Sequence, residues 1–180
     1  FSGNTASAIA IVTVSDNTAP VAISKDIDVY LDETGFAQIT AEEINDGSFD
    51  NCSIADISID INSFDCENIG ENQVLLTITD LSGNTATDTA SVTILDNILP
   101  QIICVADTTI DVPEQVGTYT VTGNSFDATA SDNCSFTISN NFNESPSLQA
   151  AVFAEGTTEI EWTVTDQAGN VSTCSMSITV

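Results

Sequence analysis

The chain has 180 residues, with 27 Asp and Glu, one Lys, no Arg and no His, and a formal net charge of −26. This balance excludes nucleic acid as a partner, because phosphate contacts need Lys or Arg, and it disfavours direct contact with an anionic membrane surface. The 42% content of hydrophobic residues is too high for a disordered acidic tail. We therefore expect a folded protein that tolerates self-repulsion or binds cations.

An ending made of a Gly-Asn turn and an alternating strand recurs along the chain. Its glycines are Gly3, Gly83 and Gly169, which are 80 and 86 residues apart. A period of this length with one shared ending indicates tandem domains. We predict that residues 1–17 are the final strand and linker of a preceding repeat, and that residues 18–97 and 98–180 are two full repeats.

Strand signals dominate the first full repeat. We expect strands over residues 21–24, 27–31, 36–40, 57–61, 72–80 and 85–95, and no helix beyond one turn near residues 40–45. In the last strand Ala90, Val92 and Ile94 share one parity, and Thr and Ser share the other. This alternation predicts a sheet with one buried and one solvated face.

The second repeat shows the same pattern 86 residues later, which places Trp162 on Leu76. Trp162 is therefore interpreted as a core residue rather than as a ligand-stacking one. About seven short strands per repeat predict an all-β fold of tandem immunoglobulin-like antiparallel β-sandwiches. Pro20 and Pro100 end short Asp-Asn-x-x-Pro linkers, which should limit the swing between consecutive domains.

The five cysteines suggest disulfides, although five free buried thiols are the alternative. Cys104 and Cys174 occupy positions held by Ser24 and Asp88 in the first repeat, so their joint presence favours a pair. Cys52 is expected to pair with Cys66, which leaves Cys134 over. Disulfides indicate an oxidising, extracytoplasmic location. The lack of His argues against a zinc site or a catalytic cysteine.

Acidic and amide side chains recur in the loops that such a sandwich brings to one end of each repeat. They lie in the incoming linker, in the Asp-Asn-Cys loop and at the last hairpin. We predict that they bind Ca²⁺, which takes six to eight oxygen ligands. Each residue alone would also serve as an ordinary turn former. The candidate ligands are Asp16, Asn17, Asp50, Asp80 and Asn84 at one junction, and Asp96, Asn97, Asp132, Asp166 and Asn170 at the next.

The motifs Asp-Asn-x-x-Pro, Asp132-Asn133-Cys134 and Thr163-Val164-Thr165-Asp166-Gln167-Ala168-Gly169-Asn170 resemble those of the hyalin-repeat (HYR) family. The resemblance covers residues 18–180 and is looser in the first repeat. It implies immunoglobulin-like modules that act in adhesion and extension at the cell surface, with no catalytic residues. Such arrays are similar to those in very large surface adhesins of gliding, type IX-secreting bacteria.

The sequence bears on three classes of function: a structural stalk, a binding module and an enzyme. A stalk of an extracellular or cell-surface adhesin, whose partners are neighbouring repeats, fits the recurrence of the same loops. The alternative is a module that binds surface glycans or other surface proteins. An enzyme is disfavoured, because without His and Arg the chain has almost no cationic side chain to stabilise a transition state.

Overall fold

The computed structural model describes residues 1–180, and nearly all of its regular structure is β-strand. The elements are β1 (Ile27–Tyr30), β2 (Phe36–Gln38), α1 (Ala41–Ile44), β3 (Ile54–Ile59), β4 (Ser63–Asp65), the 3-10 turn η1 (Cys66–Asn68), β5 (Gly70–Asp80), β6 (Thr85–Leu95), β7 (Gln101–Ile103), β8 (Thr108–Thr109), β9 (Thr118–Thr120), β10 (Thr129–Ser131), β11 (Phe136–Asn140), β12 (Val152–Ala154), β13 (Thr157–Asp166) and β14 (Val171–Thr179).

Two compact units make up the chain. The first contains Phe1–Ile27, Thr40–Asn62 and Gln73–Ser91, and the second contains Asp28–Ile39, Ser63–Asn72 and Val92–Val180. The division of the chain into repeats at residues 18–97 and 98–180 stays a prediction.

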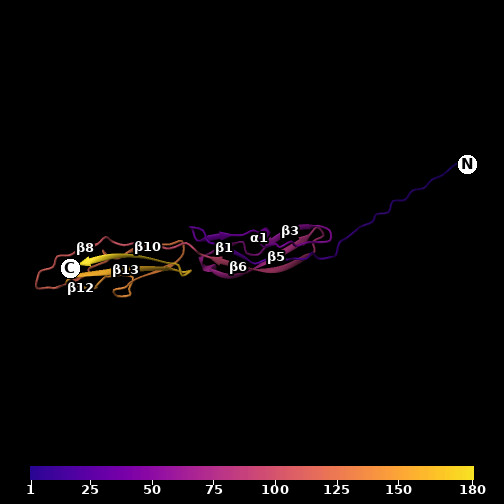
Figure 1. The fold of residues 1–180 in the computed structure, drawn as a ribbon. Coiled ribbons are helices and arrows are strands. Elements are labelled where there is room, and N and C mark those ends of the chain that lie inside the picture. The colour runs from indigo at the N-terminus through magenta and orange to yellow at the C-terminus, as the bar shows by residue number, and fades with distance from the viewer. The chain divides into compact units, whose positions relative to one another are not determined.

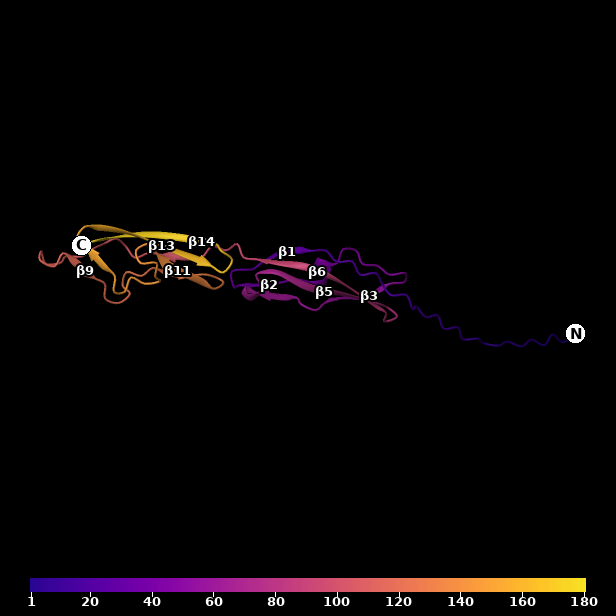
Figure 2. The same cartoon turned by 90° about the horizontal axis from the view of Figure 1, so that it is seen from below.

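The strands of residues 98–180 form one four-stranded sheet and two short strand pairs. The sheet has the order β11-β13-β14-β8, and β7 pairs with β10 while β9 pairs with β12. Strands β13 and β14 run antiparallel and side by side, and β8 joins the edge of the sheet in parallel to β14 (Figures 1 and 2). The later strands β11, β13 and β14 thus share one sheet with the early β8, whereas β7, β9, β10 and β12 form the two separate pairs.

Side chains from both sheets fill the core between them. Phe153 of β12 and Val121 lie in one cluster with Trp162 of β13 and Met176 of β14. Trp162 has none of its surface exposed, so its interpretation as a core residue is confirmed. Partly buried side chains such as Tyr119 and Ile138 pack against this cluster, which is stabilised by burial of apolar surface.

The earlier strands repeat this order of pairing. A sheet with the order β1-β6-β5-β3 is accompanied by the pair β2-β4. Val74, Leu76 and Ile78 alternate along β5 and are fully buried, as the period-2 pattern predicted. The all-β, immunoglobulin-like fold expected from the sequence is confirmed.

Two segments differ from the predicted strands. Residues 21–24 make only isolated bridges, from Val21 to Phe49 and from Ser24 to Asn45. Side chains take up the N–H groups that a longer ladder would use, since Ser24 N donates to an Asp88 oxygen at 2.7 Å. Residues 1–20 form no helix or strand. The interpretation of residues 1–17 as the final strand and linker of a preceding repeat stays a prediction.

The disulfides correct one of the two expected pairings. Cys104 is bonded to Cys174, as the comparison of the repeats favoured. The pairing of Cys52 with Cys66 is wrong, because Cys66 is bonded to Cys134 and Cys52 is an exposed free thiol. The repeat pattern favoured a disulfide partner for Cys66 within residues 18–97. In the second unit, however, the turn at Cys66 lies against the loop that follows β10.

Candidate metal centres

Three carboxylates converge in the second unit and form what we call the Asp96 cluster. Asp96 follows β6, Asp132 follows β10, and Asp166 is the last residue of β13. One oxygen from each lies within 4.8 Å of the others. Asp96 and Asp166 are only 8% and 6% exposed, so the cluster is largely withdrawn from water.

Asn170 holds the two buried members of this cluster in place. Its backbone N–H donates to Asp166 Oδ1 and its Nδ2 to Asp166 Oδ2, both at 2.7 Å. The same Nδ2 also donates to the backbone oxygens of Asp96 and Ile98, at 3.1 and 3.3 Å. Asn170 therefore acts in the structure as a donor that fastens the incoming linker to the last hairpin.

Several oxygens of the cluster region have no hydrogen-bond partner although they are buried. Asp96 Oδ1 accepts from Ile98 N at 3.0 Å, and Asp132 Oδ2 accepts from Cys134 N at 2.9 Å. The other oxygens, Asp96 Oδ2 and Asp132 Oδ1, are buried without a partner, and so is Asn133 Oδ1. Unpaired buried acceptors are costly and call for an explanation at each position.

The electrostatics of the cluster favour a bound cation. Burial raises the pKa of Asp132, and the charges of Asp166 and Asp96 raise it further, against hydrogen bonds from the backbone that lower it. Lys25 is the sole Lys in a chain without Arg or His, and it belongs to the first unit, so the second unit itself contains no basic side chain. Gathered carboxylate and amide oxygens are the ligands that Ca²⁺ prefers, so the residues present fit this ion.

A similar group, the Asp16 cluster, lies in the first unit and contains Asp16, Asp50 and Cys52. Their ligand atoms lie within 4.8 Å of one another, and Asp16 Oδ2 and Asp50 Oδ1 are buried without a partner. Asn84 repeats the role of Asn170, since its Nδ2 donates to Asp80 Oδ2 at 2.7 Å and to the backbone oxygen of Asp16 at 3.3 Å.

The thiol of Cys52 stays protonated at neutral pH. A hydrogen bond to Asp16 raises its pKa, and burial and the charges of Asp16, Asp50 and Asp80 raise it further. A neutral thiol is a poor metal ligand and a poor nucleophile. The Asp16 cluster therefore offers carboxylate oxygens rather than sulfur.

The remaining predicted ligands lie around the two clusters. Asp80 is 2% exposed, and its hydrogen bonds from Asn84, Ser82 and Gly83 outweigh its burial and lower its pKa. Asn17 and Asn97 are exposed in the linkers. Sequence reasoning missed Asn133, whose recurrence in both Asp-Asn-Cys loops was the available signal.

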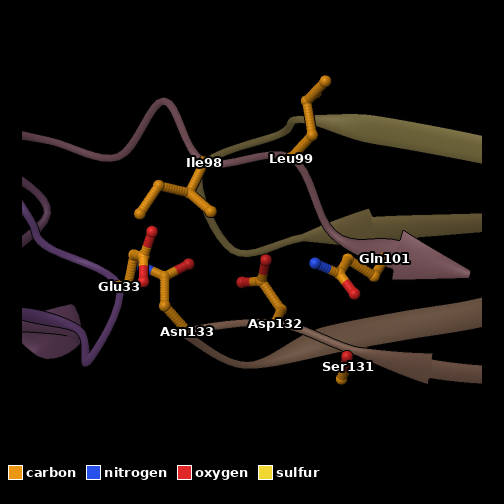
Figure 3. A pocket seen from close by; sticks show the side chains of 7 residues that line it. All are labelled: Glu33, Ile98, Leu99, Gln101, Ser131, Asp132 and Asn133. Atoms are coloured by element: carbon orange, nitrogen blue, oxygen red, sulfur yellow. The ribbon is translucent and has the colours of Figure 1, made fainter.

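A cavity of about 330 Å³ opens beside the Asp96 cluster. Figure 3 shows the Asp132 carboxylate pointing toward the loop that carries Ile98 and Leu99. The cavity is lined by Glu33, Ile98, Leu99, Gln101, Ser131, Asp132 and Asn133, all of them in the second unit. Of the three carboxylates of the cluster, Asp132 lines this cavity.

Fold and loops together define an immunoglobulin-like sandwich protein with acidic loop clusters and disulfides. Residues 95–180 match the model of the HYR domain family, which supports an extracellular, non-enzymatic module of the adhesion type. No curated protein sequence matches the chain. The disulfides fit an oxidising compartment. None of the helices has the length and apolar character needed to span a membrane.

Among solved structures the chain is similar to modules of cadherin and immunoglobulin type. It is 15% identical to protocadherin gamma C5 EC1-3, with a TM-score of 0.35. The match covers 91% of this chain and 68% of the protocadherin chain. For protocadherin gamma B7 domains 1-4 the values are 15% identity, a TM-score of 0.34, and 91% and 51% coverage. For DIP-gamma IG1+IG2 the identity is 10% and the TM-score 0.36, and the match covers 91% of this chain and 98% of that chain. At these identities and TM-scores the likenesses say nothing about what this chain binds.

Proposed function

We propose that the chain consists of repeats of an adhesion-type stalk at the cell surface, in which Ca²⁺ and disulfides stiffen the array. The observation that carries this proposal is the recurrence of buried, unpartnered carboxylate oxygens at equivalent loops, Asp16 with Asp50 and Asp96 with Asp132. Without a cation, the mutual repulsion of these carboxylates would push the linker and the Asp-Asn-Cys loop apart. A cation bound there would tie each linker to the loops around it.

Calcium suits these clusters better than the common alternatives. Zinc in proteins takes mainly His and Cys, and this chain has no His and only one free thiol. Magnesium demands a small octahedral shell, whereas Ca²⁺ accepts irregular sets of carboxylate, amide and water oxygens. Asp96, Asp132 and Asp166 would supply carboxylates, and water from the adjoining cavity would complete the shell.

Thermal unfolding in millimolar Ca²⁺ and in excess chelator tests the proposal. A ligand that binds only the folded state stabilises it by about 2.7 kcal/mol at a hundredfold excess over its dissociation constant. We expect the midpoint to rise with Ca²⁺ and to rise less in Asp132→Asn. Asp111→Asn is the matched control, because Asp111 is an exposed carboxylate of the same unit outside the cluster. Equal midpoints with Ca²⁺ and chelator would overturn the proposal.

The partners of such a stalk are the neighbouring repeats. The alternative function is a binding module, which would recognise surface glycans or other surface proteins. The large adhesins of gliding bacteria offer the setting that the HYR-like motifs suggest. Saturable binding of the chain to a glycan array would favour the binding module. Absence of binding, together with a Ca²⁺-dependent midpoint, would favour the stalk.

A further inference from the structure

A disulfide and a side-chain hydrogen bond anchor the loop Asp132-Asn133-Cys134. Cys134 is bonded to Cys66, whose backbone oxygen accepts from Gln167 Nε2 at 2.8 Å. Asn133 Nδ2 donates to the backbone oxygen of Asp32 at 3.2 Å. All of these residues belong to the second unit, so these anchors lie within one compact body.

Gly35 makes this close packing possible. A Cβ atom at Gly35 would lie 2.7 Å from the backbone oxygen of Asn133 and 2.9 Å from Cys66 Sγ. Real Cβ atoms do not approach other atoms so closely, so any larger residue would push the loop or the disulfide away. The φ angle of Gly35 is +78°, which also favours glycine.

Asn133 presents its carboxamide oxygen to the Asp96 cluster. Its Nδ2 is used for Asp32 and lies 3.4 Å from Asp96 Oδ1, while its Oδ1 is buried and has no partner. Asp96, which is more than nine-tenths buried, also leaves Oδ2 unpartnered at this place. Two residues whose side chains approach each other thus each carry a buried oxygen without a partner.

The equivalent loop of the Asp16 cluster lacks these anchors. Its local geometry is the same, since Cys52 N donates to Asp50 Oδ2 at 2.8 Å, as Cys134 N does to Asp132. However, Cys52 is a free thiol and both Asn51 and Cys52 are exposed.

We propose that Asn133 is a further ligand of the cation, and that the Cys66–Cys134 disulfide and Gly35 position it so that the Asp96 cluster binds divalent cations more tightly than it would without these two anchors. This rests on the proposed Ca²⁺ binding. A ligand held in its bound conformation loses less entropy on binding, and support of this kind typically changes metal affinity 10- to 100-fold. By linkage, a bound cation protects this disulfide against reduction to the same degree.

Calorimetric titration of the full chain with Ca²⁺ tests the proposal. We expect the affinity of the Asp96 cluster for Ca²⁺ to fall by about tenfold or more in Cys66→Ser/Cys134→Ser. Cys104→Ser/Cys174→Ser is the matched control, because it removes a disulfide of nearly the same span, 70 residues against 68. Asn133→Ala should weaken the same site while both disulfides stay intact.

Gly35→Ala gives a test that keeps every cysteine. Gly123→Ala is its control, since Gly123 has the same φ of +78° but no atom within 4 Å of an added Cβ. Weaker binding in Gly35→Ala than in Gly123→Ala supports the proposal, and this pair decides if the cysteine variant does not fold. If the chain binds no Ca²⁺, the proposed function itself fails. If Ca²⁺ binds with equal affinity to all variants and controls, the anchoring proposal alone is overturned.

Discussion

A hydrogen-bonded pair in the first unit occupies the place of a disulfide, and this predicts that a disulfide can be built there. Ser24 N and Oγ donate to Asp88 Oδ2 at 2.7 and 2.9 Å. The sequence alignment of the repeats places Ser24 on Cys104 and Asp88 on Cys174, and these cysteines are bonded with their Cα atoms 5.8 Å apart. The double substitution Ser24→Cys/Asp88→Cys should therefore form a bond on oxidation.

The new bond would close a segment of 64 residues. Loop-closure entropy for this length amounts to about 4 kcal/mol, and the loss of the hydrogen bonds between the two side chains reduces the gain. For a domain of this size each kcal/mol shifts the midpoint by about 4–8 °C, so the oxidised variant should melt several degrees above its reduced form.

Mass spectrometry of free thiols and thermal unfolding together measure this effect. The variant is made in a Cys52→Ser background, so that the exposed thiol cannot exchange with the new pair. The two single substitutions serve as controls for the loss of the polar pair. Failure of the bond to form on oxidation, or a bond that leaves the midpoint unchanged, would refute the equivalence of the two positions.

Three further predictions concern the sheets. Hydrogen bonds from the backbone and side chain of Ser24 lower the pKa of Asp88, so the stability that Asp88 contributes is present above its ordinary pKa of about 4 and is lost as pH falls through the lower folded value. Asp88→Asn should thus weaken the acid dependence of unfolding measured in urea from pH 5 to pH 2. Trp162→Ala should cost about 3–5 kcal/mol in the same assay, because Trp162 is fully buried, and Trp162→Phe should cost less because it also removes a buried Nε1 without a partner. Cys104→Ser/Cys174→Ser should lower the free energy of unfolding by about 4 kcal/mol and should leave Cys66–Cys134 as the disulfide through which reductant still acts.

The acidic loops show how far local patterns lead toward a site. The recurrence of Asp in linker, loop and hairpin tip pointed to Asp96, Asp132 and Asp166, and the structure brings their oxygens together. The same pattern grouped Asn84 and Asn170 with the ligands, whereas the structure shows their amide groups donating to Asp80 and Asp166. Residue type shows that an amide can coordinate, but only the surrounding acceptors decide whether its nitrogen or its oxygen is used.

What the sequence determined by itself is the all-β fold, the buried face of each long strand and the core position of Trp162. These follow from alternation with period 2 and from turn residues, which act over a few neighbouring positions. Only the tertiary structure decided the partner of Cys66, because a bond over 68 residues depends on which loops meet in space. The same meeting of loops brings the backbone of Asn133 against Gly35, which has no side chain to block it, and buries the carboxamide oxygen of Asn133.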